Sequence, residues 1–361
     1  TSMQGCHLIA PATGTWTLVS GSGVITNPGS PTTGITGLTL GTNVFQWTVS
    51  NGPCSNPVTS DQVTINVFSG SAQQADAGPD QTICSTTTSV TLAGNAPVGL
   101  ATGIWTVVQG SGTFTNATQF NTTVTALGIG QNIFRWSIDN GACGTSFDQM
   151  SVFVYDNNNP LANAGPDQSL CTPNTTTIMA GSVLTFPAVG TWNLVSGTGN
   201  IVDPNSPTTQ INGLGVGANV FQWTVNNGPC AVGVTTDQVI INVFDDNAPT
   251  ASAGPDQSVC TPVSSVTMAA NPPVGVATGT WTLIQGGGIF ANAASATTTV
   301  SGLQIGLNTY VWTLNNGPCG TSSDTVSVLV FDANAPVANA GPDQELCLPQ
   351  TTTNLAGSPL V

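Results

Sequence analysis

The sequence predicts an all-β protein built from tandem β-sandwich repeats, and three observations carry this prediction. Tryptophans and cysteines recur at one fixed step, because Trp281 follows Trp105 at the same distance along the chain as Cys230 follows Cys54. Self-similarity at a fixed period indicates one structural unit copied along the chain. Apolar and polar residues alternate in short windows, as in half-buried strands. Finally, Gly, Pro and Thr interrupt the longer apolar runs, and no window has apolar residues at helical spacing.

The strands of one repeat can be placed in order between residues 75 and 157. The expected segments are an entering segment at 77–84 and strands at 89–94, 103–112, 122–127, 131–141 and 148–156. Alternation is clearest at Phe134, Trp136 and Ile138, which point to one face. The Asn140-Gly141 pair that follows favours a hairpin turn into the last strand. Short antiparallel strands at this density predict two packed sheets, with Trp105 and Trp136 as a central pair.

The same pattern divides the whole chain. We expect an incomplete repeat at 1–70 that lacks its first strand, followed by repeats at 75–157, 162–246 and 251–333. Residues 338–361 are expected to be the opening segment of a further repeat, or a donor strand for the next copy. We call these ranges the first to fourth repeats and the tail.

Composition excludes several classes of function. The chain has no lysine, one arginine (Arg135), one histidine (His7) and sixteen acids, giving a net charge of −15. Phosphate binding needs clustered basic residues, so no nucleic-acid partner is expected. Docking on anionic lipid fails for the same reason, and no membrane insertion is expected. His7 lies in the incomplete repeat without a partner base or nucleophile, so we expect no enzyme and no required cofactor.

The cysteines indicate a covalent framework. One pair falls in each full repeat, and the spacing within the pair is the same in all three, which predicts one disulfide per repeat in an oxidising compartment. The expected bonds are Cys84 with Cys143, Cys171 with Cys230, and Cys260 with Cys319. Buried free thiols are the alternative. Zinc is disfavoured because no CxxC spacing occurs.

Several motifs together resemble a known family. AGPDQ at 77, 164, 253 and 340 is followed by a TLAG variant, GTWT, N-x-F-x-W and a closing D-x-V-x-V. This order resembles PKD-type, immunoglobulin-like repeats, and the version with paired cysteines and NNGPC is similar to repeats of Bacteroidota surface adhesins and gliding-associated proteins. The resemblance implies a secreted β-sandwich rod on the bacterial cell surface, exported by the type IX pathway. The sequence shows neither the signal peptide nor the sorting domain of such proteins.

The two ends of the sequence leave two cysteines without an expected partner. The first repeat lacks its opening cysteine, which leaves Cys54 alone, and Cys347 lies in the tail. Either the chain continues as a longer array, or copies join head-to-tail with Cys54 bonded to Cys347 of another copy. Cys6 aligns with Ser182 and is a substitute partner for Cys54 or a free thiol.

Recurring acids at the junctions suggest a calcium site. Linker acids lie close in sequence to the Asp of GPDQ, and oxygen ligands at a domain boundary suit Ca²⁺. The candidate ligands are Asp156, Asp167, Asp245, Asp246, Asp256, Asp332 and Asp343. The alternative is that these residues cap turns. The junction after the first repeat lacks linker acids.

Sugars are a further candidate modification. Asn116, Asn121 and Asn174 lie in N-x-T sequons, and Asp324-Thr325-Val326 resembles the O-glycosylation sequon of Bacteroidota. The function we expect is a structural, non-enzymatic extracellular filament or adhesin stalk. The alternative is an adhesive module that binds carbohydrate or another surface ligand through loops at the sandwich ends. That alternative needs exposed aromatic residues, and Phe120, Phe147 and Phe186 are the only loop or edge candidates.

Overall fold

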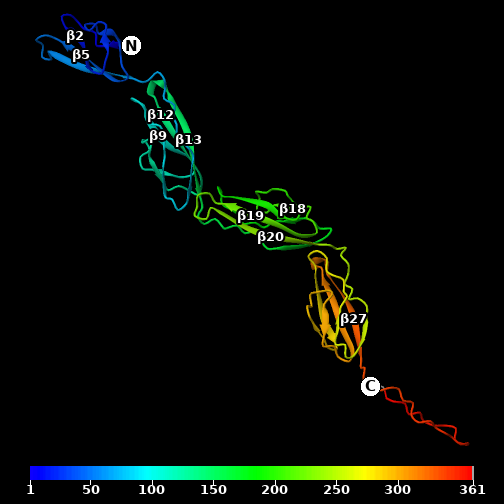
Figure 1. The fold of residues 1–361 in the computed structure, drawn as a ribbon. Coiled ribbons are helices and arrows are strands. Elements are labelled where there is room, and N and C mark those ends of the chain that lie inside the picture. The colour runs from blue at the N-terminus through cyan, green and yellow to red at the C-terminus, as the bar shows by residue number, and fades with distance from the viewer. Residues whose placement is uncertain (360–361) are drawn as a thin grey trace. The chain divides into compact units, whose positions relative to one another are not determined.

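The computed structural model describes residues 1–359, and its regular secondary structure is β-strand apart from two short 3-10 turns (Figure 1). Contacts between backbone positions group the chain into two units. Unit 1 comprises Thr1–Leu161, Val183–Gly190 and Val225–Thr235; unit 2 comprises Ala162–Ser182, Thr191–Thr224 and the residues from Thr236 onward. The loop 225–235 of the third repeat therefore belongs with the second repeat.

The second repeat is a sandwich of a four-stranded and a three-stranded sheet. The larger sheet has the order β7-β13-β12-β9 and the smaller one β10-β11-β8. The elements are β7 (Gln81–Cys84), β8 (Ser89–Thr91), β9 (Thr102–Gln109), β10 (Thr113–Phe114), β11 (Thr123–Thr125), β12 (Gly130–Asp139), the 3-10 turn η1 (Gly141–Cys143) and β13 (Thr145–Tyr155). β7 runs parallel to β13 and forms the edge of its sheet, with Gln81 opposite Val152 and Cys84 opposite Tyr155.

The first repeat has the same plan without the parallel edge strand. Its sheets have the orders β2-β5-β6 and β1-β4-β3. The strands are β1 (Ser2–Gln4), β2 (Thr13–Ser20), β3 (Val24–Ile25), β4 (Thr32–Thr36), β5 (Gly41–Ser50) and β6 (Val58–Val67). Among residues 1–359, β6 pairs with β5 and has no strand on its other side.

The third and fourth repeats both regain the four-stranded sheet. The third has the orders β14-β20-β19-β16 and β15-β18-β17, and the fourth β21-β27-β26-β23 and β22-β25-β24. The strands of the third are β14 (Gln168–Cys171), β15 (Thr177–Ile178), β16 (Val189–Ser196), β17 (Asn200–Ile201), β18 (Gln210–Asn212), β19 (Gly217–Asn226) and β20 (Val234–Phe244). The elements of the fourth are β21 (Gln257–Cys260), β22 (Ser265–Thr267), β23 (Thr278–Gln285), β24 (Ile289–Phe290), β25 (Thr299–Ser301), β26 (Gly306–Asn315), the turn η2 (Gly317–Cys319) and β27 (Thr321–Phe331).

Alternation along the long strands decides which residues form each core. In β12, Phe134, Trp136 and Ile138 are fully buried, whereas the residues between them are partly exposed. Trp136 lies opposite Trp105 of β9, and the ring centroids are 5.1 Å apart. Equivalent tryptophan pairs occur in the other three repeats at 5.0 or 5.1 Å. The predicted central pair is confirmed.

A buried asparagine ties the two long strands to the loop that precedes them. Asn132 is 1% exposed; its Nδ2 donates to the carbonyls of Gly128 and Val152, and its Oδ1 accepts from the amide of Ser111. Asn43, Asn219 and Asn308 make the corresponding bonds in the other repeats. A buried amide is tolerated only when its donors and acceptor are satisfied, as they are here.

Candidate functional site: the locked junctions between repeats

The cysteines bond across the junctions between repeats. Cys84 of the second repeat bonds to Cys230 of the third, and Cys171 of the third bonds to Cys319 of the fourth. The Cα atoms are 4.9 and 5.2 Å apart. The expected bonds within repeats, Cys84 with Cys143, Cys171 with Cys230 and Cys260 with Cys319, are therefore wrong. Cys143 and Cys260 are exposed thiols.

The length of the last strand explains this correction. Cys143 lies just before β13, whereas Cys84 lies beside Tyr155 at the end of that strand. A strand rises about 3.3 Å per residue, so the 11 residues of β13 hold the two cysteines roughly 30 Å apart. A disulfide needs Cα atoms within about 7 Å. The two cysteines of each expected pair therefore lie at opposite ends of one sandwich. Each bonded cysteine is instead paired with a cysteine of a neighbouring repeat.

An aromatic ring and an asparagine complete the junction after the second repeat. The ring of Tyr155 lies on Gly228, where a Cβ atom would be 2.7 Å from ring carbons. Gly228 also has φ +55°, a conformation that favours glycine. The buried side chain of Asn227 donates from Nδ2 to the carbonyl of Asp156 at 2.8 Å. We call this combination of disulfide, aromatic ring and Asn-Gly loop the junction lock.

The junction after the third repeat has the same lock, built within unit 2. Phe244 lies on Gly317, where a Cβ atom would be 2.6 Å from the ring. Asn316 donates from Nδ2 to the carbonyl of Asp245 at 2.8 Å. Cys171–Cys319 supplies the disulfide. The Asn-Gly pair predicted as a hairpin turn therefore has a second role, because it contacts the end of the preceding repeat.

The junction after the first repeat has the noncovalent parts of the lock alone. Phe68 lies against Gly141, and Asn140 donates to the carbonyl of Gln73 at 3.1 Å. Cys143 stands in the position of Cys230 and Cys319 but is unbonded. A cleft of about 390 Å³ remains beside Phe68, lined in part by Leu40, Val98 and Leu100.

The linker after the second repeat is held by further contacts within unit 1. Asn159 accepts from the amide of Thr185 at 2.9 Å and donates to Asn227 Oδ1 at 3.0 Å. Phe153 of β13 meets Phe186 edge-on at 6.2 Å. This contact gives Phe186, a candidate for ligand binding from its loop position, a packing role.

Most of the calcium candidates accept backbone hydrogen bonds. Asp156, Asp245 and Asp332 each cap a turn by accepting the amide two residues later, at 2.9 Å in every case. Asp167 and Asp256 instead accept amides of the last strand, from Ile240 and Ser327 at 2.8 Å. These bonds fasten the opening segment to the sheet. They explain the recurrence of these acids without an ion, and calcium binding stays a prediction.

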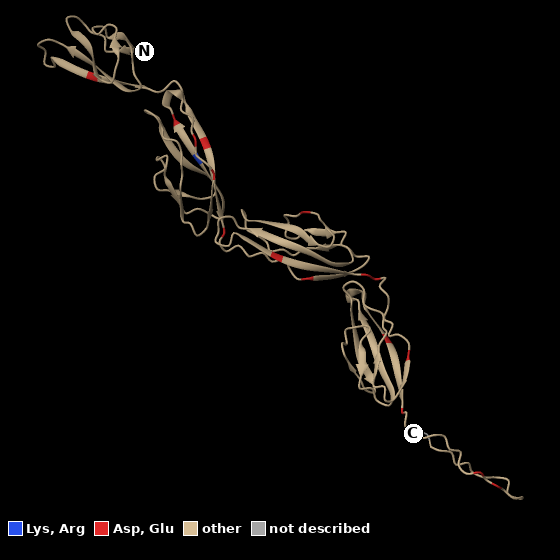
Figure 2. Cartoon of the chain, viewed as in Figure 1, with Lys and Arg blue, Asp and Glu red and all other residues tan. Residues whose placement is uncertain are grey.

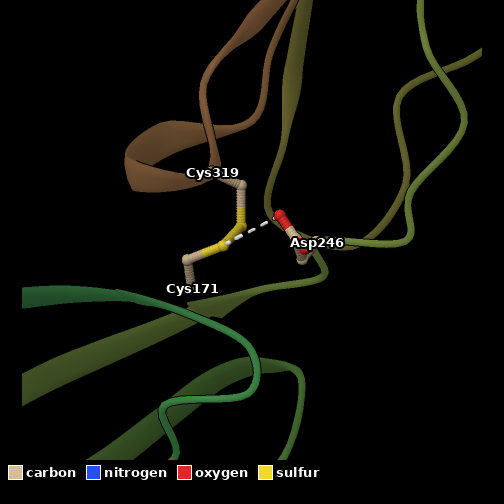
Figure 3. A group of neighbouring side chains, drawn as sticks. All are labelled: Cys171, Asp246 and Cys319. Atoms are coloured by element: carbon tan, nitrogen blue, oxygen red, sulfur yellow. Dashed lines mark hydrogen bonds between the residues drawn. A yellow bond between two sulfur atoms is a disulfide. The ribbon is translucent and has the colours of Figure 1, made fainter.

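Asp246 is the exception, because its carboxylate faces a disulfide (Figure 3). Its Oδ1 lies 3.7 Å from Cys171 Sγ. The bonded sulfur carries no hydrogen, so this is a contact and not a donated hydrogen bond. Within residues 1–359, Cys171, Asp246 and Cys319 form the one group of three potential metal ligands. Since two of them are bonded to each other, the group does not offer a metal site. Asp343 lies in the tail, apart from any such group.

The remaining predicted sites are accessible. Asn116, Asn121, Asn174 and Thr325 are exposed, as glycosylation requires. Cys6, Cys54 and Cys347 are exposed thiols in this chain. His7 is exposed in a loop.

The surface offers little for aromatic or charged recognition. All eight tryptophans are buried, with at most 5% exposure, and the acids are dispersed along a mostly uncharged chain (Figure 2). Phe147 is 63% exposed but lies under the guanidinium of Arg135, 4.4 Å from the ring centroid. Phe120 packs against the core of its repeat. The helical residues in the described part of the chain are single 3-10 turns, none of which could span a membrane.

Comparison with known proteins finds partial matches and no family model. No family model matches the chain. The mouse Dyslexia-associated protein KIAA0319 homolog is 27% identical over 245 residues, covering 63% of this chain and 23% of the relative. The mouse Dyslexia-associated protein KIAA0319-like protein is 29% identical over 213 residues, covering 55% and 20%. The chain thus matches only about a fifth of the length of these relatives.

Among solved structures, the PKD domain from the KIAA 1837 protein is 29% identical, covers 25% of this chain and 93% of its own, and has a TM-score of 0.22. The I67-I69 fragment of titin is 12% identical, covers 71% and 97%, and has a TM-score of 0.32. The sheet topology itself, two packed sheets that recur in each repeat, is that of tandem immunoglobulin-like (PKD-like) β-sandwich repeats, and the disulfides indicate an oxidising environment. The curated relatives are mammalian, so the expected origin in Bacteroidota and export by the type IX pathway stay predictions.

Proposed function

We propose that this chain is a structural, non-enzymatic segment of an extracellular stalk or filament, of the kind that carries a bacterial surface adhesin. The observation that supports the proposal is the interlaced pair of disulfides, Cys84–Cys230 and Cys171–Cys319. Each bond crosses a linker between repeats, so neighbouring repeats stay joined even if the linker contacts open. Closing a loop of 146 residues stabilises the folded state by about 5 kcal/mol in the chain-entropy model.

The interlacing shortens the covalent path along the chain. Without the disulfides, the path from Cys84 to Cys319 follows the backbone through both linkers. With them, the path crosses from Cys84 to Cys230, returns along the chain to Cys171 and crosses to Cys319. Fully extended, these two paths span about 800 and about 200 Å at roughly 3.5 Å per residue. A stalk under tension benefits from that limit, because unfolding of the repeats between these cysteines cannot lengthen it further.

Single-molecule pulling tests this function. The chain would be tethered at both ends and stretched with and without reductant. The stalk function predicts that the oxidised chain stops several hundred ångströms short of the reduced chain. Equal extension of the two forms would contradict it. A Cys84→Ser, Cys171→Ser double variant is the matched control and should extend as the reduced chain does.

An adhesive role through the end loops has less support. Carbohydrate sites use exposed aromatic rings. Here Phe186 and Phe147 are 59% and 63% exposed, but each already packs on a neighbour, Phe186 edge-on against Phe153 and Phe147 under Arg135. The proposed partners are therefore further repeats of the same kind, in a longer chain or in copies joined head-to-tail, at the bacterial cell surface.

A further inference from the structure

We infer that Asn140, Asn227 and Asn316 are latent sites of deamidation. Each is protected while its junction is closed and is converted to aspartate or isoaspartate while the junction is open, after which the Asn-Gly contact cannot re-form. These residues belong to the Asn-Gly pairs at the three junctions, with Gly141, Gly228 and Gly317. The inference goes beyond the stalk function, because it assigns a covalent modification to the junctions.

Deamidation of an Asn-Gly pair is an internal reaction that needs water as its sole co-reactant. The backbone nitrogen of glycine bonds to Cγ of the asparagine and gives up its proton. The bond from Cγ to Nδ2 breaks, and Nδ2 leaves with that proton as ammonia. Water then adds to one of the two carbonyls of the resulting five-membered imide and opens it, giving aspartate or isoaspartate. Glycine favours the reaction because it has no Cβ atom to hinder the approach of its nitrogen.

The closed junction turns the attacking nitrogen away from the side chain. The backbone angle ψ of the asparagine is 23° at Asn140 and 36° at Asn316. At these values the glycine nitrogen is nearly eclipsed with the asparagine's own nitrogen about the Cα–C bond. Because Cα is tetrahedral and of the L form, the glycine nitrogen then lies on the side opposite Cβ. It cannot reach Cγ without a rotation of ψ.

Hydrogen bonds within the loop oppose that rotation. The amide of Asn140 donates to the carbonyl of Gly144 at 2.8 Å, and the amide of Cys143 donates to the carbonyl of Asn140 at 3.1 Å. Asn316 makes the two equivalent bonds. Each attacking nitrogen is also occupied, because its N–H donates to the side chain two residues earlier. These bonds join Gly141 to Asp139, Gly228 to Asn226 and Gly317 to Asn315, at 2.9 or 3.0 Å.

The preceding repeat covers both reacting groups. Asn227 is 5% exposed, and its Nδ2, the group that must leave, donates to the carbonyl of Asp156 at 2.8 Å. The ring of Tyr155 lies on Gly228, whose nitrogen must attack. The junctions before and after this one have the same arrangement, with Phe68 on Gly141 and Phe244 on Gly317. Opening of a junction removes these contacts together and admits water.

The product cannot restore the contact. At neutral pH an aspartate side chain has acceptor oxygens and no donor, so at position 227 it would face the carbonyl of Asp156 without a hydrogen bond. It also adds a negative charge to a chain whose net charge is −15. Isoaspartate lengthens the backbone by one carbon and changes the turn. The disulfide Cys84–Cys230 still joins the repeats, so the modification loosens the junction and leaves the chain in one piece.

The experiment is a time course of deamidation in the oxidised full chain at mildly alkaline pH, with mass-spectrometric mapping of each asparagine. Tyr155→Ala removes the ring at the junction after the second repeat, and Phe244→Ala, the matched control, removes the ring at the junction after the third. Because deamidation samples the open junction, Tyr155→Ala should speed it about tenfold at Asn227 and leave Asn316 unchanged. Phe244→Ala should do the reverse.

Asn212-Gly213 reports general unfolding in the same samples. This pair lies at the end of β18, outside the junctions. Its deamidation should proceed at one rate in the parent chain and in both variants. Equal rates at Asn227 in the folded parent and in the urea-unfolded chain would overturn the inference. A rise at Asn212 that matches the rise at the junction asparagine in both variants would overturn the role of the junction.

Asn227→Asp tests the irreversible step, because this variant carries the product in advance. Hydrogen exchange in the linker 156–161 should rise about tenfold relative to the parent chain. A parent chain aged until Asn227 is deamidated should show the same rise after its return to fresh neutral buffer. Unchanged exchange in both samples would overturn this step. Neither result alters the extension limit set by the disulfides, so the pulling test of the stalk function is separate.

Discussion

At the residue scale, small differences between the copies show which contacts each repeat needs. Trp136, Trp223 and Trp312 donate their indole N–H to an acceptor just after the short strand β8, β15 or β22. These acceptors are Asn95, Ser182 and Asn271. Within residues 1–359, Trp47 Nε1 is buried without a partner. The first repeat has Cys6 where the third has Ser182, the acceptor for Trp223 at 3.1 Å. Because a thiol is a weak acceptor, this substitution leaves the indole unsatisfied.

Cys6→Ser should therefore stabilise the first repeat by about 1 kcal/mol, the typical value of one buried hydrogen bond. Urea unfolding of the chain, monitored by hydrogen exchange in residues 1–70, measures the change in stability of the first repeat. Ser182→Cys is the reverse control and should destabilise the third repeat by a similar amount. An unchanged first repeat would show that Trp47 finds another acceptor.

Tyr310 replaces the phenylalanine that Phe45, Phe134 and Phe221 supply in the other repeats. Its hydroxyl donates to the carbonyl of Gly287, and burial raises the pKa of its phenol above the ordinary 10.0. A raised pKa means that folding favours the neutral phenol, so this stability is present below pH 10 and is lost as pH rises further.

We expect the fourth repeat to lose stability above pH 10 and Tyr310→Phe to remove that loss. Phenolate absorbance, taken as the difference between the chain and this variant, gives the midpoint for Tyr310, and urea unfolding gives the stability. A midpoint at or below 10.0 would contradict the prediction.

The carboxylate of Asp246 beside Cys171–Cys319 should slow reduction of that bond. A negative charge near the sulfur repels the attacking thiolate and disfavours the departing one. Asp246→Asn should speed reduction by a thiol reagent about twofold to threefold, less at high salt because Asp246 is exposed. Asn157, whose Oδ1 lies 3.5 Å from Cys84 Sγ, gives the converse test, since Asn157→Asp should slow reduction of Cys84–Cys230. Rates that do not respond to either change would rule out the electrostatic effect.

At the scale of elements, the long strands can be predicted from the sequence and the pairing of the cysteines cannot. β12 and β13 show clear alternation, and their positions agree with the expected segments 131–141 and 148–156. β10 escapes prediction, because two residues are too short to show a period. The spacing of the cysteines alone is compatible with a disulfide inside each repeat. The direction of the strand between them, which the spacing does not show, rules that disulfide out.

A usable signal is present in the order of the elements. Cys143 precedes an 11-residue strand that ends at the next linker, so it lies at the end of the sandwich that faces the previous repeat. Parallel pairing of β7 with β13, which places Cys84 at the other end, leaves no mark in the sequence. The recurring Asn-Gly pair indicates a hairpin by itself, and its contact with Tyr155 or Phe244 depends on the neighbouring repeat.

Asn227→Ala tests the Asn-Gly part of the junction lock. The variant removes the hydrogen bonds to Asp156 and Asn159 and leaves the partly buried carbonyl of Asp156 without this donor, a cost of about 1–3 kcal/mol. Hydrogen exchange in the linker 156–161 should rise about tenfold or more, corresponding to at least about 1.4 kcal/mol. Asn51→Ala is the matched control, because Asn51 holds the same place in the first repeat and is exposed. Equal exchange in both variants would contradict the role of Asn227.

At the scale of the whole molecule, the interlaced bonds change what a single break in the backbone does. Between Cys84 and Cys319, every peptide bond lies inside at least one disulfide-closed loop, and the two loops overlap from Cys171 to Cys230. A protease cut anywhere in that span therefore leaves the two fragments covalently attached. A recognition site inserted in the linker 157–160 tests this directly: after cleavage, the chain should run as one band without reductant and as two with it. If each disulfide joined two cysteines of one repeat, the same cut in the linker would separate the chain into two fragments without reductant. With the observed bonds, one cut in the backbone leaves the chain in a single covalent piece.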